Sequence, residues 1–91
     1  MSETVERSLV IRNKYGLHAR PAAEFVKRAH AFDCDVWVRK GELEVNGKSI
    51  MGMMMLAAEH GAEIVIRAAG ADAGRAVDAL SALVDSRFGE E

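Results

Sequence analysis

Hydrophobic and polar positions in the first third of the chain change from a strand-like to a helix-like spacing. Residues 6–12 are rich in Leu9, Val10 and Ile11, which is typical of a β-strand. A loop is expected at residues 13–16. From about Ala19 to Ala31 the apolar residues then recur at helical spacing: Ala22, Phe25, Val26 and Ala29. The pattern predicts a strand, a loop and an amphipathic helix.

Two short alternating segments follow and predict a hairpin. Residues 35–39 place Val36 and Val38 on one side and Trp37 on the other, and residues 42–45 place Leu43 and Val45 on the inner side. Lys40-Gly41 supplies the turn between them. After a second turn at Asn46-Gly47, Ser49 is a natural N-cap for a short apolar helix at residues 50–57.

The last third of the chain predicts one more strand and one more helix. Residues 63–67 alternate, and Asp72 is expected to cap a helix with an apolar stripe formed by Ala76, Val77, Leu80, Leu83 and Val84. Phe88-Gly89 is expected to end it. The order β-α-β-β-α-β-α predicts an α+β, two-layer open-faced sandwich, with a mainly antiparallel four-stranded sheet and three helices on one face. The expected core contains Phe25, Val26, Val36, Val38, Ile64, Ile66, Val77, Leu80 and Leu83.

Size and charge restrict the function. The 91 residues suit a single domain, residues 1–91, whose chemistry is expected on the surface because so small a core encloses no deep cavity. A net charge of −2 argues against general nucleic-acid binding. Between Val10 and His30, however, five basic residues face one acid. This basic segment favours an anionic ligand or an acidic partner surface.

Cysteine content and hydropathy suggest where the protein works. Cys34 is the only cysteine, so neither an intramolecular disulfide nor a cysteine-based metal cluster is possible. The first eight residues are polar and acidic, unlike a secretory signal, and the longest apolar run is too short to span a bilayer. We therefore expect a cytoplasmic protein that does not bind membranes.

The strongest candidate for chemistry is His18. Because proline is tolerated only in the first turn of a helix, Pro21 places His18 at or next to the N-cap and Arg20 in the first turn. The free N–H groups and positive dipole end of a helix N-terminus bind phosphate. A neutral imidazole can act as a nucleophile, and the Arg20 guanidinium matches phosphate oxygens.

Less specific interpretations of these residues stay open at this point. A single loop histidine is often only solvated or capping, and no second ligand lies at helical spacing from His18 to make a metal site. His30, at a helix end, and His60, in a loop before Gly61, are not assigned a chemical role. The methionine-rich helix is either filling the core or forming an adaptable docking surface.

Two sequence blocks indicate a function more specifically than the spacing of apolar and polar residues does. Residues 13–22, NKYGLHARPA, closely resemble the active-site signature of HPr-family phosphocarriers, and residues 46–52, NGKSIMG, resemble the regulatory-serine segment of that family. The separation of His18 from Ser49 also matches the family pattern, and the resemblance covers nearly the whole chain. Two such blocks at the right separation are highly specific.

The resemblance implies the following roles. His18 accepts a phosphoryl group at Nδ1 from Enzyme I, which is charged by phosphoenolpyruvate, and passes it to an EIIA domain. Arg20 stabilises the phosphohistidine. The protein is then a stoichiometric carrier, expected to be monomeric, with no metal or cofactor of its own, and not an enzyme with its own turnover.

The resemblance also implies a regulatory surface. Ser49 would be phosphorylated by an ATP-dependent HPr kinase/phosphorylase, and Ile50, Met51 and Met54 would form the docking patch, with Lys27 contributing to partner binding. Met53 and Met55 are bulkier than the residues typical of this block.

Three alternatives are weighed. The chain could serve the sugar-uptake branch or, as an HPr-like regulatory module acting mainly by binding partners, the nitrogen-related branch of the phosphotransferase system. A regulatory paralogue without the histidine is disfavoured by His18 itself. A small α+β enzyme such as an acylphosphatase is disfavoured because no matching phosphate loop is present.

Overall fold

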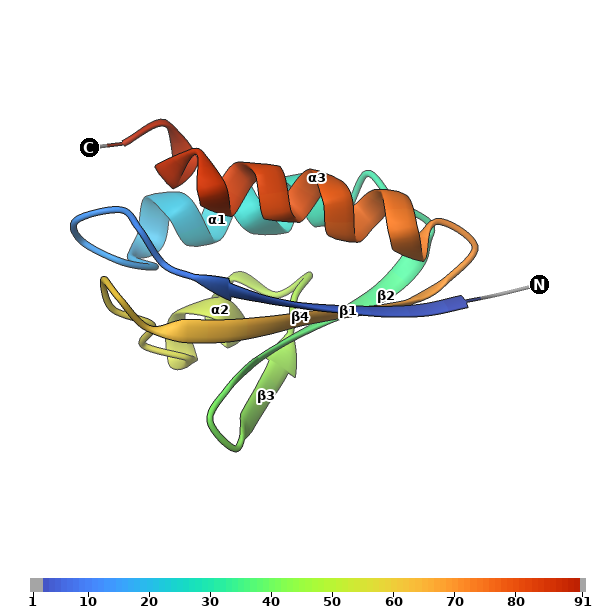
Figure 1. The fold of residues 1–91 in the computed structure, drawn as a ribbon, viewed down its shortest axis with the longest axis horizontal. Coiled ribbons are helices and arrows are strands. Elements are labelled where there is room, and N and C mark those ends of the chain that lie inside the picture. Colours follow the sequence, from blue (N-terminus) through green and yellow to red (C-terminus); the bar gives the residue numbers. More distant parts are fainter. Residues whose placement is uncertain (1–2, 91) are drawn as a thin grey trace.

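In the computed structural model, which describes residues 3–90, the chain forms one antiparallel sheet with helices packed on it (Figure 1). The strands are β1 (Glu3–Val10), β2 (Cys34–Lys40), β3 (Leu43–Asn46) and β4 (Glu63–Gly70). The helices are α1 (Ala19–Ala29), α2 (Ile50–Met55) and α3 (Ala73–Asp85), followed by a single 3-10 turn, η1 (Arg87–Gly89). The predicted element order and fold class are confirmed.

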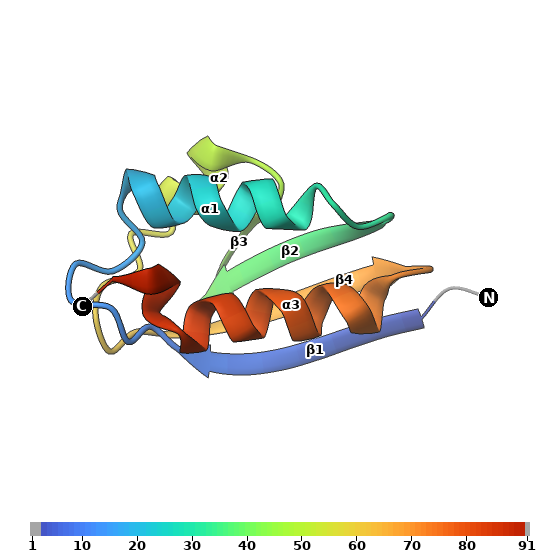
Figure 2. The ribbon, with the colours of Figure 1, turned by 90° about the horizontal axis from the view of Figure 1, so that it is seen from above.

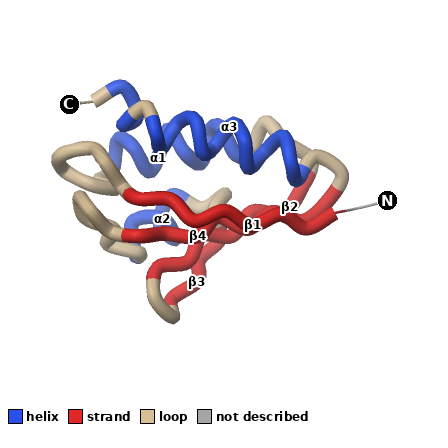
Figure 3. The backbone as a smooth tube through the Cα atoms, in the orientation of Figure 1, coloured by secondary structure: helices blue, strands red, loops and turns tan. Residues whose placement is uncertain are grey.

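The sheet has the order β1-β4-β2-β3, and every neighbouring pair is antiparallel. Figure 3 shows α1 and α3 lying together over one face, while the strands form the second layer. Helix α2 packs against α1 and β3, and Figure 2 shows it on the side of α1 that faces away from α3. Among the described residues no helix is long and apolar enough to cross a bilayer.

The core lies between the helices and the sheet, as the periodicity predicts. Eight of the nine side chains expected there are buried: Phe25, Val26, Val36, Val38, Ile64, Ile66, Val77 and Leu80. Leu83 is the exception, because it lies at the edge of the α3 stripe and is only half-buried.

Two local predictions need correction. Leu43 was expected to face inward but is 44% exposed, because β3 is a short edge strand that pairs only with β2. Asp72 occupies the N-cap position of α3, yet its carboxylate accepts a hydrogen bond from the Asp33 N–H and caps nothing. Glu3 caps α3 instead, by accepting from the Gly74 N–H at 3.0 Å.

The expected element ends also shift by a few residues. The first strand begins and ends earlier than residues 6–12, and the last strand continues to Gly70. Helix α3 ends at Asp85, before the Phe88-Gly89 pair that was expected to end it. The extra turn, η1, proves important because it brings the C-terminal end back across the molecule.

Candidate functional site

The candidate site lies where the loop from β1 enters α1. His18 is the N-cap of α1, with extended backbone (φ −74°, ψ −176°), and Arg20 and Pro21 are in the first turn, as predicted. The His18 side chain makes no cap hydrogen bond. Pro21 has no N–H, so the N–H groups of Ala19 and Arg20 are the ones that open from the end of the helix. This terminus therefore keeps its capacity to bind an anion.

The loop that carries His18 is held by backbone bonds to the α2–β4 connection. The Leu17 N–H donates to the Ala58 carbonyl at 2.8 Å, and Ile11 exchanges hydrogen bonds with Gly61 and Ala62. Gly16 is needed here for two reasons. Its φ of +67° is left-handed, and a Cβ at this position would lie 2.4 Å from the Ala58 carbonyl oxygen. The segment before His18 is therefore tightly fixed.

A side chain inside the loop completes this support. Asn13 is fully buried, and its Nδ2 donates to the Gly16 carbonyl at 2.7 Å. Its Oδ1 is buried without a hydrogen-bond partner. Spacing alone did not single out Asn13 as a site residue, although it begins the NKYGLHARPA block.

The C-terminal end of the chain supplies a carboxylate to the same site. Both Glu90 carboxylate oxygens lie 3.1 Å from His18 Nε2, and one lies 3.3 Å from an Arg20 guanidinium nitrogen. Asn13 Nδ2 donates to the other oxygen at 3.1 Å. Figures 1 and 2 both place the C-terminal end beside the loop that precedes α1. Sequence analysis missed Glu90, which is 72 residues from His18.

The electrostatics of this cluster favour an ionised Glu90. Burial alone would raise the pKa of its carboxyl, but hydrogen bonds from His18 and Asn13 and the nearby positive charge of Arg20 outweigh burial and lower that pKa. The Glu90 side chain is 12% exposed, against 40% for His18 and 67% for Arg20. The histidine and arginine thus remain open to a partner while the carboxylate beneath them is shielded.

A shallow hollow of about 450 Å³ surrounds these groups, lined by Tyr15, His18, Arg20, Gly89 and Glu90. Tyr15 is 71% exposed, and its ring meets the His18 ring edge-on with centroids 6.3 Å apart. An open hollow with an exposed nucleophile suits chemistry that a protein partner completes.

Helix α2 presents the second predicted cluster. Ser49 is its N-cap, as expected, and Oγ accepts a hydrogen bond from the Gly52 N–H at 3.0 Å. Ile50, Met51 and Met54 are exposed, and so is Met55, which was not assigned to the patch. Met53 is fully buried. The methionine-rich helix therefore both fills the core, with one side chain, and offers a surface for docking, with four apolar side chains that face solvent.

Lys27, the remaining predicted site residue, is exposed in the last turn of α1 next to Arg28. These two line a small surface hollow with Glu24 and Ala31. Lys27 is on the same helix as His18 but at its opposite end, so the structure does not bring it into the His18 cluster.

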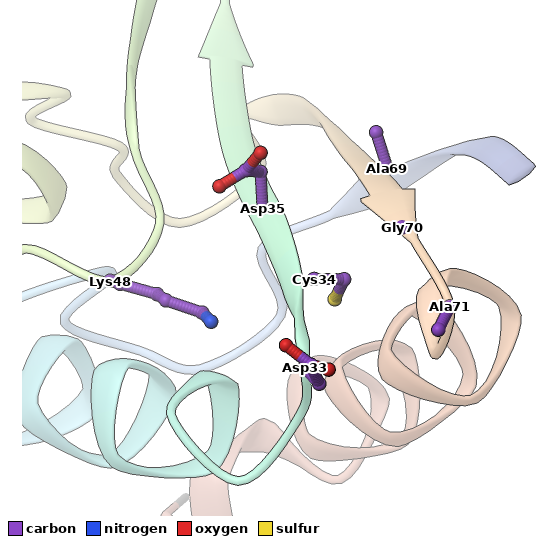
Figure 4. A pocket seen from close by; sticks show the side chains of 7 residues that line it. All are labelled: Asp33, Cys34, Asp35, Lys48, Ala69, Gly70 and Ala71. Carbon is purple, nitrogen blue, oxygen red and sulfur yellow. The ribbon is translucent and has the colours of Figure 1, made fainter. Parts of the chain in front are cut away.

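Another hollow, of about 400 Å³, lies at the start of β2 and the end of β4 (Figure 4). It is lined by Asp33, Cys34, Asp35, Lys48 and residues 69–71. Burial raises the pKa of the Cys34 thiol, which keeps it in the unreactive protonated form. The Lys48 ammonium already donates to the Phe32 carbonyl at 3.0 Å. This hollow is consequently a poor candidate for chemistry.

Comparison with known proteins agrees with the geometry. A family model described as the PTS HPr component phosphorylation site matches residues 5–86. The chain belongs to the HPr family of phosphocarriers of the phosphotransferase system. The phosphocarrier protein HPr of Neisseria meningitidis is 48% identical over 94% of this chain and 97% of its own length. The phosphocarrier protein NPr of Shewanella violacea is 40% identical over 94% of each chain.

The fold of the family is shared in full. The crystal structure of HPr-C-His from Thermoanaerobacter tengcongensis superposes with a TM-score of 0.92, at 47% identity and over 96% of this chain and 98% of that one.

Proposed function

We propose that this protein accepts a phosphoryl group on His18 from phosphorylated Enzyme I and delivers it to an EIIA domain. The observation that carries the proposal is the juxtaposition of an exposed imidazole, an open helix N-terminus and the Arg20 guanidinium at one surface site. Family membership supports this chemistry. Residues 13–22 resemble the active-site signature of the family, and the resemblance assigns the nucleophile's role to His18. The proposal includes no turnover of the protein's own.

The transfer of the phosphoryl group to His18 needs no general base. The lone pair on Nδ1 of neutral His18 attacks phosphorus, a nitrogen–phosphorus bond forms, and the bond between phosphorus and the donor breaks. This step requires the neutral ring to carry its hydrogen on Nε2, so that no proton has to leave Nδ1. The phosphoryl oxygens meet the Arg20 guanidinium and the N–H groups of the first turn of α1. In delivery, a nucleophile of the EIIA domain attacks phosphorus, the bond between phosphorus and Nδ1 breaks, and the electron pair of that bond returns to Nδ1.

Ser49 and the apolar patch formed by Ile50, Met51 and Met54 are proposed as the regulatory and docking elements. A phosphate on Ser49 would sit at the N-terminus of α2, where the helix dipole accommodates it. It would add negative charge beside the patch, and Lys27 would meet acidic residues of a partner. An HPr kinase/phosphorylase is the proposed source of that phosphate.

The nitrogen-related branch is the second candidate, because NPr of Shewanella violacea aligns over the same span as the HPr relatives. A carrier that works mainly by binding would still dock through α2 but would show slow transfer to sugar-specific EIIA. We propose a cytoplasmic monomer in either case. A Thermoanaerobacter tengcongensis HPr that is 48% identical was solved as a dimer, so sedimentation of this chain tests the monomer directly.

One experiment tests the assignment. The full chain is incubated with Enzyme I and phosphoenolpyruvate, and then with EIIA proteins of each branch. We expect one acid-labile phosphate per chain, mapped to His18, that moves to EIIA. Phosphate on another residue, or none, would overturn the carrier assignment, whereas transfer to only one EIIA identifies the branch.

A further inference from the structure

Near its C-terminal end the chain turns back sharply at residues 87–90, which we call the hook. Arg87, Phe88 and Gly89 have consecutive left-handed backbone, with φ of 60°, 54° and 73°. For the two non-glycine residues this conformation is strained, because their Cβ atoms crowd the backbone. Phe88 is 5% exposed and anchors the hook in the core, and the Glu90 N–H donates to the Arg87 carbonyl at 2.8 Å. Such strain persists where surrounding contacts impose it.

The hook ends with the Glu90 carboxylate against one particular nitrogen of His18. Both carboxylate oxygens contact Nε2 at 3.1 Å. An ionised carboxylate can only accept hydrogen bonds, so Nε2 must be the nitrogen that carries hydrogen. In the neutral ring the lone pair is then on Nδ1, the nitrogen that the proposed function requires as nucleophile.

The other partners of Glu90 hold it in this position. Asn13, fully buried in the preceding loop, donates to one oxygen, and Arg20 lies 3.3 Å from the other. The carboxylate is thus fixed from two sides before any phosphoryl donor arrives. A carboxylate that holds one imidazole nitrogen in its N–H form, and stabilises the ring as it becomes cationic, is an established way of orienting a histidine.

We infer that Glu90 is a positioning residue that fixes His18 as the Nε2–H tautomer and directs phosphorylation to Nδ1. When Nδ1 bonds to phosphorus, Nε2 keeps its hydrogen and the ring becomes positively charged. The carboxylate beside Nε2 then stabilises that charge. The inference rests on the proposed function for its meaning, but the tautomer itself belongs to the unphosphorylated protein.

The test measures the tautomer ratio of His18 by long-range ¹H–¹⁵N correlation spectra, at a pH where the ring is neutral. Loss of one charge-assisted hydrogen bond of about 1.4 kcal/mol corresponds to about tenfold in an equilibrium. Glu90→Ala should therefore lower the ratio of Nε2–H to Nδ1–H about tenfold, toward that of a synthetic peptide of residues 13–22. Glu90→Gln, which keeps the shape without the charge, should give an intermediate ratio.

The matched control is Asp85→Ala, which removes an exposed carboxylate from the end of α3 without touching the hook. It should leave the ratio unchanged. A wild-type ratio in both Glu90 variants would overturn the inference. Because no Enzyme I is present, the outcome is independent of carrier function: a wild-type protein that fails to accept phosphate refutes the proposed function without altering the tautomer result.

Discussion

Helices α1 and α2 begin with similar backbone conformations, but only α2 is capped by the side chain of its N-cap residue. Their N-caps, His18 and Ser49, are both extended, and neither helix has an acidic residue in its first turn. Ser49 closes α2 by accepting from the Gly52 N–H. The His18 ring turns away from its own helix toward Glu90, and so leaves α1 open. The uncapped end of α1 can therefore donate hydrogen bonds from its N–H groups to an anionic ligand, whereas the cap of α2 primarily stabilises the fold.

The first prediction tests the open end. His18→Ala should abolish acid-labile phosphorylation by Enzyme I, because no other group at the start of α1 is a nucleophile. His60→Ala is the matched control, since His60 is exposed in the α2–β4 connection, and it should be phosphorylated like the wild type. Radiolabelled phosphoenolpyruvate provides the measurement. Normal labelling of His18→Ala would assign the chemistry elsewhere.

The second prediction concerns the charge beside the open end. Arg20→Ala should slow transfer to and from His18 about tenfold, less than the loss of a fully buried donor because Arg20 is largely exposed. The free energy of unfolding should change by no more than about 0.5 kcal/mol, since no core volume is lost. Rapid-quench kinetics and chemical denaturation measure the two effects.

Two further variants make that result specific. Arg20→Lys should recover part of the rate, because it restores the charge without the forked geometry. Arg12→Ala, which removes an exposed charge from the same basic segment, should have a much smaller effect. Equal losses for Arg12→Ala and Arg20→Ala would mean that the field of the whole segment matters and the position of Arg20 does not.

The sequence predicted the two helix ends because their signals are local. Pro21 fixes the start of α1, and Ser49 followed by an apolar run fixes the start of α2, so neither depends on distant contacts. Periodicity identified the core for the same reason. Glu90 could not be found this way: its place at His18 depends on left-handed backbone at Arg87 and Phe88 and on a contact across 72 residues.

The hydrophobic pattern also could not predict the surroundings of residues at the edge of the sheet and at the start of α3. Alternation assigned Leu43 to the inner side of its strand, but alternation does not show that β3 is the edge strand. The Asp72 carboxylate accepts a hydrogen bond from the Asp33 N–H, and α3 is capped by Glu3, near the other end of the chain. Local rules identify which groups need a partner, and the tertiary fold decides which partner they find.

The third prediction adds charge to the closed end. Ser49→Asp places a carboxylate at the α2 N-cap, where it can still accept from the Gly52 N–H. We expect phosphorylation of His18 by Enzyme I to slow about threefold at low salt, because an acidic partner surface would meet repulsion beside the apolar patch. Ser49→Asn caps without charge and should behave like the wild type. Added salt should reduce the effect. Wild-type kinetics for Ser49→Asp at low salt would leave Ser49 as an ordinary N-cap.

The fourth prediction, with the smallest effect on function, opens the closed end instead. Ser49→Ala removes the acceptor for the Gly52 N–H and should lower the free energy of unfolding by about 1 kcal/mol, the usual value of an N-cap. Ser49→Asn should stay within a few tenths of a kcal/mol of wild type, because it caps equally well. Urea denaturation measures both. Phosphorylation of His18 should remain unchanged in either variant, since the opened end of α2 carries no imidazole and no arginine in its first turn. If Ser49→Ala were as stable as wild type, α2 would be held by Met53 packing in the core, and the cap would contribute little to the difference between the two helix ends.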